Sequence, residues 1–136
     1  MAFYIDSCIY LNVWKKEKKF WKSSEKLLQE IEDNNYKIFY SGFILKELQY
    51  KIFPRKLKIK INLFENSENF IKINLSKEEF LLARKLEGKF NFKISFFDII
   101  HIILAKKSNS ILITKDKKLM KIANKLNVKT LNPKDY

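Results

Sequence analysis

The segment Phe3-Tyr4-Ile5-Asp6-Ser7 predicts the fold most directly. Three consecutive apolar residues are typical of a short buried strand, and an acid and a hydroxyl directly after them are typical of a strand end that caps a helix. Outward from this segment, short apolar runs alternate with helical patterns. This alternation indicates a parallel sheet with helices on both faces.

The chain has only 2 Gly and 2 Pro, so we expect mostly regular structure joined by Asn, Ser and Lys residues. The expected strands cover residues 3–5, 36–40, 70–73, 110–113 and 128–131. One helix should follow Asp6, a second should span 20–31 with Phe20 on its apolar face, and a third should begin at Ser41 and be stopped by Pro54. Further helices should begin at Ser76 and span 95–107 and 115–126. Residues 57–63 fit a strand and a helix equally well. We expect one domain over residues 1–136.

Four acidic residues interrupt or directly follow apolar sequence: Asp6, Glu47, Asp98 and Asp116. Burying a carboxylate is costly unless it is paired, hydrogen-bonded or bound to metal. The rest of the chain is basic, with 28 Lys+Arg against 15 Asp+Glu and a net charge of +13. Acids set in apolar sequence within a basic chain predict a hard-cation site beside a polyanion-binding surface, and hence metal-dependent phosphodiester cleavage.

Each acid also has a plain structural interpretation. Asp6 could cap the first helix, and Glu47 could form an i,i+4 pair with Lys51. Asp98 completes a Ser95-x-x-Asp98 capping box, which is compatible with a ligand role. Asp116 could simply start a helix in a solvated Lys-rich turn.

Further residues near the acids are candidates for supporting roles. Ser7 and Thr114 could hydrogen-bond a carboxylate, or they could act as ordinary caps. Lys115 and Lys117 could hold substrate phosphates, or they could form a solvated face. His101 lies on an apolar helix, where a lone histidine is more often packed and hydrogen-bonded than catalytic.

The single cysteine, Cys8, excludes an internal disulfide and a cysteine-based zinc site. We find no secretory signal pattern and no apolar stretch of about 18 residues that could span a membrane. The sequence therefore favours a soluble cytoplasmic protein that does not bind membranes.

In this order, the acidic segments resemble the PIN domain family, in particular its single-domain VapC-type toxin ribonucleases. The strand ending in Asp6-Ser7, the helix with Glu47, the segment with Asp98, and the strand ending in Thr114-Lys115-Asp116 each resemble one family motif. The resemblance implies a three-layer α/β/α fold with a central, mostly parallel five-stranded sheet. It also implies Mg²⁺- or Mn²⁺-dependent endoribonuclease activity, with Asp6, Glu47, Asp98 and Asp116 as catalytic metal ligands.

The same resemblance implies an RNA substrate, a cognate antitoxin protein and a homodimer. Alternatives are an RNA-processing PIN nuclease without an antitoxin and a non-catalytic RNA-binding module. A haloacid-dehalogenase-like phosphatase is disfavoured, because its opening motif needs a second Asp where this chain has Cys8.

Overall fold

The computed structural model describes residues 1–16, 19 and 21–136, and for residue 63 it describes the backbone only. Phe20, which we expected on the apolar face of the second helix, lies outside the described residues. Five parallel strands form one sheet in the order β3-β2-β1-β4-β5. The strands are β1 (Ala2–Ile5), β2 (Lys37–Tyr40), β3 (Phe70–Lys72), β4 (Ile111–Ile113) and β5 (Thr130–Leu131).

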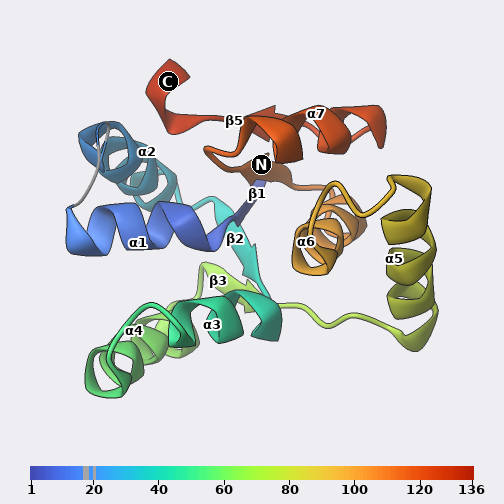
Figure 1. Cartoon of the computed structure of the whole chain (residues 1–136). Coiled ribbons are helices and arrows are strands. Elements are labelled where there is room, and N and C mark those ends of the chain that lie inside the picture. The colour runs from blue at the N-terminus through green and yellow to red at the C-terminus, as the bar shows by residue number, and fades with distance from the viewer. Residues whose placement is uncertain (17–18, 20) are drawn as a thin grey trace.

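Helices cover both faces of this sheet (Figure 1), with α1 and α2 on one side and α5 and α6 on the other. The helices are α1 (Ser7–Lys15), α2 (Trp21–Asp33), α3 (Gly42–Gln49), α4 (Pro54–Asn66), α5 (Lys77–Lys89), α6 (Phe96–Lys107), α7 (Lys117–Lys125) and the 3₁₀ turn η1 (Pro133–Asp135). The predicted three-layer fold with a parallel five-stranded sheet is therefore confirmed, and all five strands fall where the sequence placed them.

Serine side chains start several of the helices, as their positions in the sequence predict. Ser41 Oγ accepts a hydrogen bond from the Ile44 amide over 3.4 Å at the start of α3. At α5, Ser76 Oγ accepts from the Glu79 amide over 3.1 Å and Glu79 Oε1 accepts from the Ser76 amide over 2.9 Å, a complete capping box. These caps fix where each helix begins.

Residues 57–63 lie in helix α4, which settles the ambiguity between strand and helix for that segment. The expected role of Pro54 was wrong in one respect. Helix α3 already ends at Gln49, and Pro54 stands in the first turn of α4. Proline is well tolerated there because the amide that it lacks has no partner within the helix.

In this chain, asparagine occupies the left-handed backbone position that ends four of the helices, a position where glycine is usually found. Asn35, Asn91, Asn109 and Asn127 follow α2, α5, α6 and α7 with φ of 54°, 54°, 53° and 64°. At each end the next amide reaches back to a carbonyl of the last turn, as in Tyr36 N to Ile31 O at 3.1 Å and Ser110 N to Ala105 O at 2.8 Å. This is the Schellman geometry, and Asn tolerates its left-handed residue better than most other side chains do.

The sheet brings the carboxyl ends of its three middle strands to one edge. Asp6 follows β1, Ser41 follows β2 and Thr114 follows β4. The backbone continues the pairing past the strands, with Asp6 N donating to Ile113 O over 2.9 Å. The candidate site residues Asp6 and Thr114 therefore lie at the same edge, where sites of parallel sheets usually form. Separately, no helix within the described part of the chain is long and apolar enough to cross a bilayer.

Candidate active site

Asp6 is buried at the end of β1, with 7% of its surface exposed. The Thr114 hydroxyl donates to Asp6 Oδ2 over 2.8 Å, and the Cys8 thiol donates to the same oxygen over 3.5 Å. Asp6 occupies the N-cap position of α1, but its side chain makes no capping hydrogen bond. The carboxylate is therefore held by the hydroxyl that follows β4 and does not serve as a helix cap.

Glu47 contacts His101 from helix α3. Oε1 of Glu47 lies 2.6 Å from Nε2 of His101, and the two side chains are 25% and 0% exposed. Nδ1 of the same ring lies 2.7 Å from the Tyr4 hydroxyl. Among the ion pairs of the described residues, Glu47 has His101 as its partner, not Lys51. His101 is thus packed and hydrogen-bonded, as a lone buried histidine usually is, but one of its bonds goes to a candidate site residue.

Asp98 stands in the first turn of α6, where its amide donates to Ser95 Oγ over 3.1 Å. Burial, together with the negative charges of Asp6 and Asp116, raises the pKa of the Asp98 carboxyl to about 6. The imidazole of His101 and the hydroxyl of Ser95 act in the opposite direction. Asp98 therefore serves the helix start and also lies within electrostatic reach of two other acids.

Asp116 caps helix α7, as its structural interpretation predicts. Its Oδ1 accepts hydrogen bonds from the amides of Lys118 over 2.9 Å and Leu119 over 3.2 Å. Its own amide donates to Thr114 Oγ1 over 3.1 Å, which links it to the hydroxyl that holds Asp6. The side chain is exposed. Asp116 is thus placed at the rim of the acidic cluster.

Ligand atoms of Asp6, Glu47 and His101 all lie within 4.8 Å of one another. In the part of the chain that the structure describes, Asp98 and Asp116 stand outside this group. Carboxylate oxygens are the donors that Mg²⁺ and Mn²⁺ prefer. The donor set therefore fits such an ion, and a cation would also relieve the repulsion that raises the pKa of Asp98.

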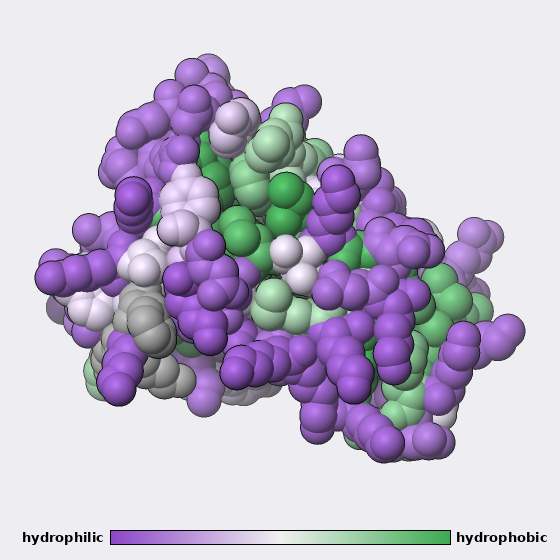
Figure 2. All heavy atoms as spheres, turned by 90° about the horizontal axis from the view of Figure 1, so that it is seen from above, coloured by the Kyte–Doolittle hydropathy of each residue, from purple (hydrophilic) through white to green (hydrophobic). Residues whose placement is uncertain are grey.

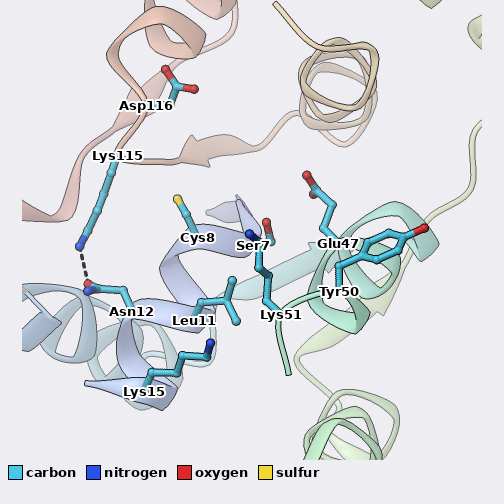
Figure 3. A pocket seen from close by; sticks show the side chains of 10 residues that line it. All are labelled: Ser7, Cys8, Leu11, Asn12, Lys15, Glu47, Tyr50, Lys51, Lys115 and Asp116. Atoms are coloured by element: carbon cyan, nitrogen blue, oxygen red, sulfur yellow. Dashed lines mark hydrogen bonds between the residues drawn. The ribbon is translucent and has the colours of Figure 1, made fainter. Parts of the chain in front are cut away.

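A cleft of about 670 Å³ opens beside this cluster (Figure 3). Side chains from α1, from α3 and the turn after it, and from the loop before α7 line the cleft: Ser7, Cys8, Leu11, Asn12, Lys15, Glu47, Tyr50, Lys51, Lys115 and Asp116. Lys115 reaches across to the side-chain oxygen of Asn12 and to the Lys19 carbonyl at 3.5 Å. Lys117 is exposed on α7 and does not line the cleft. Of the two predicted phosphate-binding lysines, the structure places Lys115 in the cleft.

The sequence did not single out Lys15, Lys51, Tyr50 and Tyr4 for the site. Lys51 lies four residues after Glu47 and Lys15 eight residues after Ser7, so helical spacing could have placed both on the site face. Tyr4 carried no such signal, because a buried tyrosine in a central strand looks like ordinary core. Cys8 is also part of the cleft, where burial and the charge of Asp6 raise the pKa of its thiol to about 12.

Comparison with curated protein sequences found no significant match. Several solved structures share the fold. A structure of VapBC2 from Rickettsia felis bound to a DNA fragment from its promoter matches with a TM-score of 0.72 and 21% identity, over 97% of this chain and 98% of that chain. FitAcB from Neisseria gonorrhoeae matches with a TM-score of 0.67 and 15% identity over 100% of both chains. A toxin-antitoxin complex from Klebsiella pneumoniae matches with a TM-score of 0.63 and 16% identity, over 96% of this chain and 97% of that chain.

These identities are low enough that the structural likeness establishes the fold alone. The sequence itself gives the family, because the PIN domain family model matches residues 3–125. That span contains Asp6, Glu47, Asp98 and Asp116, and nearly every element of the sheet. The chain therefore belongs to the PIN domain family.

Proposed function

We propose that the protein is a divalent-metal-dependent endoribonuclease that hydrolyses RNA phosphodiester bonds and acts as the toxin of a toxin–antitoxin pair. PIN domains are generally nucleases, and this chain keeps an acidic cluster of the kind that such chemistry needs. The observation that carries the proposal is the buried Asp6 and the partly buried Glu47, together at the edge of a cleft that is also lined by lysines.

Asp6 and Glu47 would hold Mg²⁺ or Mn²⁺, with Asp98 completing the charge around the ion. When bound, the ion supplies activation of a water molecule and neutralisation of the charge that develops on the phosphate. Asp116 uses Oδ1 for its cap, so its second oxygen is the one available to orient a water at the rim. The Thr114 hydroxyl holds the Asp6 carboxylate by a hydrogen bond. Ser7 lines the cleft next to Asp6 and would serve as a further supporting hydroxyl there.

The RNA would lie along the cleft, with its phosphates near Lys15, Lys51 and Lys115. Figure 2 shows a mostly hydrophilic face with an apolar area near its centre, in keeping with a chain of net charge +13. Such a charge favours a polyanionic partner, because binding releases counterions. Lys117 is the weaker candidate, because it lies outside the cleft lining.

The toxin assignment draws on similar solved structures that are toxin–antitoxin complexes. We propose a cytoplasmic antitoxin that covers the cleft and places a basic side chain against Asp6 and Glu47, where charge-assisted hydrogen bonds would hold it. Near the cleft, Tyr50 is 75% exposed and Phe53 76% exposed, and both are available to a partner. Trp14, on the neighbouring helix α1, packs against Tyr10 and Phe64. A homodimer remains a prediction to be checked by sedimentation.

The first experiment measures cleavage of structured RNAs by the purified protein in Mg²⁺, Mn²⁺ or EDTA. Asp6→Asn should remove most of the turnover, because it weakens the ion site without changing side-chain size. The matched control is Asp33→Asn, which alters an exposed acid at the end of α2. Full activity in EDTA, or equal loss in both variants, would contradict the proposal.

A second experiment separates a toxin from an RNA-processing enzyme. Expression of the chain alone should slow growth, expression of Asp6→Asn should not, and a co-expressed antitoxin should restore growth. Harmless expression of an active nuclease would leave the RNA-processing role. Binding of RNA without cleavage under any metal condition would leave the non-catalytic module.

A further inference from the structure

A chain of four side chains runs from the start of helix α3 through the core to Glu47. Ser41 Oγ lies 2.7 Å from the Tyr4 hydroxyl, and that hydroxyl lies 2.7 Å from Nδ1 of His101. Nε2 of His101 then lies 2.6 Å from Oε1 of Glu47. Tyr4 and His101 are fully buried and Ser41 is 1% exposed. Short hydrogen bonds among buried groups fix their partners firmly, because no water can replace them.

The chemistry of each group gives the chain a direction. A carboxylate can only accept, so Nε2 of His101 donates to Glu47. In a neutral imidazole Nδ1 then accepts, and the Tyr4 hydroxyl is the group that donates to it. The Tyr4 oxygen in turn accepts from Ser41, whose own oxygen accepts from the Ile44 amide at 3.4 Å. In this arrangement every hydroxyl donates once.

The distances also argue against His101 as a metal ligand. Two neighbouring ligands of an octahedral Mg²⁺ with bonds of about 2.1 Å stand about 3 Å apart. Nε2 of His101 and Oε1 of Glu47 are closer than that, at 2.6 Å, which is a hydrogen-bond distance. The other ring nitrogen is engaged by Tyr4. Of the three residues with clustered ligand atoms, His101 is therefore the one that holds a ligand in place.

We infer that His101 is a positioning residue: the Glu47 carboxylate sets its Nε2–H tautomer, the Tyr4 hydroxyl holds the ring at Nδ1, and the ring so held orients Glu47 so that its second oxygen is presented to the cation. The inference rests on the proposed metal-dependent function. Hydrogen-bonded partners of metal-ligating groups set both the orientation and the basicity of those groups. The Tyr4 hydroxyl bonds the ring nitrogen that points away from Glu47, so Tyr4→Phe changes how the ring is held while the ring itself remains.

The test uses the fact that the chain has 1 His, so its imidazole nitrogen NMR signals need no assignment. In the metal-free protein the ring should carry a proton on Nε2, where Glu47 accepts it. Tyr4→Phe removes the hydroxyl that donates to Nδ1, so the proton should stay on Nε2, where Glu47 accepts it, while the ring is held less firmly. Mn²⁺ titrated calorimetrically should bind more weakly to Tyr4→Phe, and roughly 10- to 100-fold more weakly to His101→Leu. His101→Gln, whose amide can still donate to Glu47, should recover part of that loss.

Tyr40→Phe is the matched control, because Tyr40 is a buried tyrosine on the neighbouring strand β2. It should change neither the tautomer nor the Mn²⁺ affinity. A proton on Nδ1 instead of Nε2 in the wild-type protein, or an unchanged Mn²⁺ affinity of Tyr4→Phe, would overturn the inference. If RNA is cleaved but these readouts fail, the inference alone falls. If the readouts hold but no RNA is cleaved, the proposed function falls instead. If His101→Leu fails to fold, the wild-type tautomer and the Mn²⁺ affinity of Tyr4→Phe still test the inference.

Discussion

Replacing Asp98 by Asn should make the metal-free protein more stable while removing activity. Burial, the largest cause, and the charges of Asp6 and Asp116 raise the pKa of Asp98 from 3.8 to about 6. The folded state therefore binds more protons than the unfolded state between these two values. Stability falls as pH rises through this window, and the full penalty is present above about pH 6.

The size of the effect follows from the pKa shift. A difference of about two pKa units corresponds to about 3 kcal/mol at 1.36 kcal/mol per unit. Asp98 is partly exposed, and screening by water lowers this figure to about 1–2 kcal/mol. For a chain of this size, the melting temperature should rise by about 4 °C per kcal/mol. Asn keeps the size of the side chain and removes the charge that burial disfavours.

Urea unfolding in EDTA at pH 7.5 and at pH 4 measures the prediction. The gain from Asp98→Asn should be present at pH 7.5 and mostly absent at pH 4, where the wild-type carboxyl is protonated in the folded state. The control is Glu79→Gln. The Lys107 ammonium and the Ser76 amide lower the pKa of Glu79, so its charge stabilises the fold above the unfolded pKa and this stabilisation is lost in acid. Glu79→Gln should therefore destabilise the protein at pH 7.5. A less stable Asp98→Asn protein at pH 7.5, or an equal gain at both pH values, would refute this reasoning.

Two further predictions concern the cleft. Lys51→Glu should weaken RNA binding, and the slope of log affinity against log salt concentration should become shallower by about 0.7 for each RNA phosphate that a lysine no longer neutralises. Lys37→Glu, at the amino end of strand β2, should change little. Equal effects of the two variants in a fluorescence titration would count against an RNA bound in the cleft. Cys8 should react with iodoacetamide at pH 8 roughly a thousandfold more slowly than a free cysteine, because burial and the charge of Asp6 raise the pKa of its thiol to about 12. Unfolding in urea should restore the rate of a free cysteine. A fast reaction of the folded protein would argue against the burial of Cys8.

The strands and most helix starts could be predicted because their signals are local. An apolar run before Asp6, a serine three residues before Glu79 and a serine three residues before Asp98 each specify one element end. Helix α4 was ambiguous for a physical reason. Its lysines alternate with apolar residues over seven positions, so its period fits a strand as well as a helix. Packing of Phe64 against Tyr10 and Tyr40 is a tertiary contact that no local pattern contains.

The site could be predicted in part for a related reason. Asp6, Glu47, Asp98 and Asp116 stand out because acids are rare in apolar sequence, but their separate contacts depend on distances across the sheet. Tyr4 and His101 are 97 residues apart and meet because β1 lies beside α6. The sequence also carried no sign of which lysines line the cleft, because this basic chain has many lysines.

Helix α1 begins without the side-chain cap that several other helices of this chain have. Ser41, Ser76, Ser95 and Asp116 all use their side chains as helix caps, whereas Asp6 occupies the same position at α1 without doing so. A cap of this kind contributes about 1 kcal/mol, and helix α1 does without it. The Asp6 carboxylate is instead turned to Thr114 at the carboxyl edge of the sheet, beside Glu47. Local rules are broken most often at functional sites, and α1 begins at the one acid that both the sequence and the geometry place at the centre of this cluster.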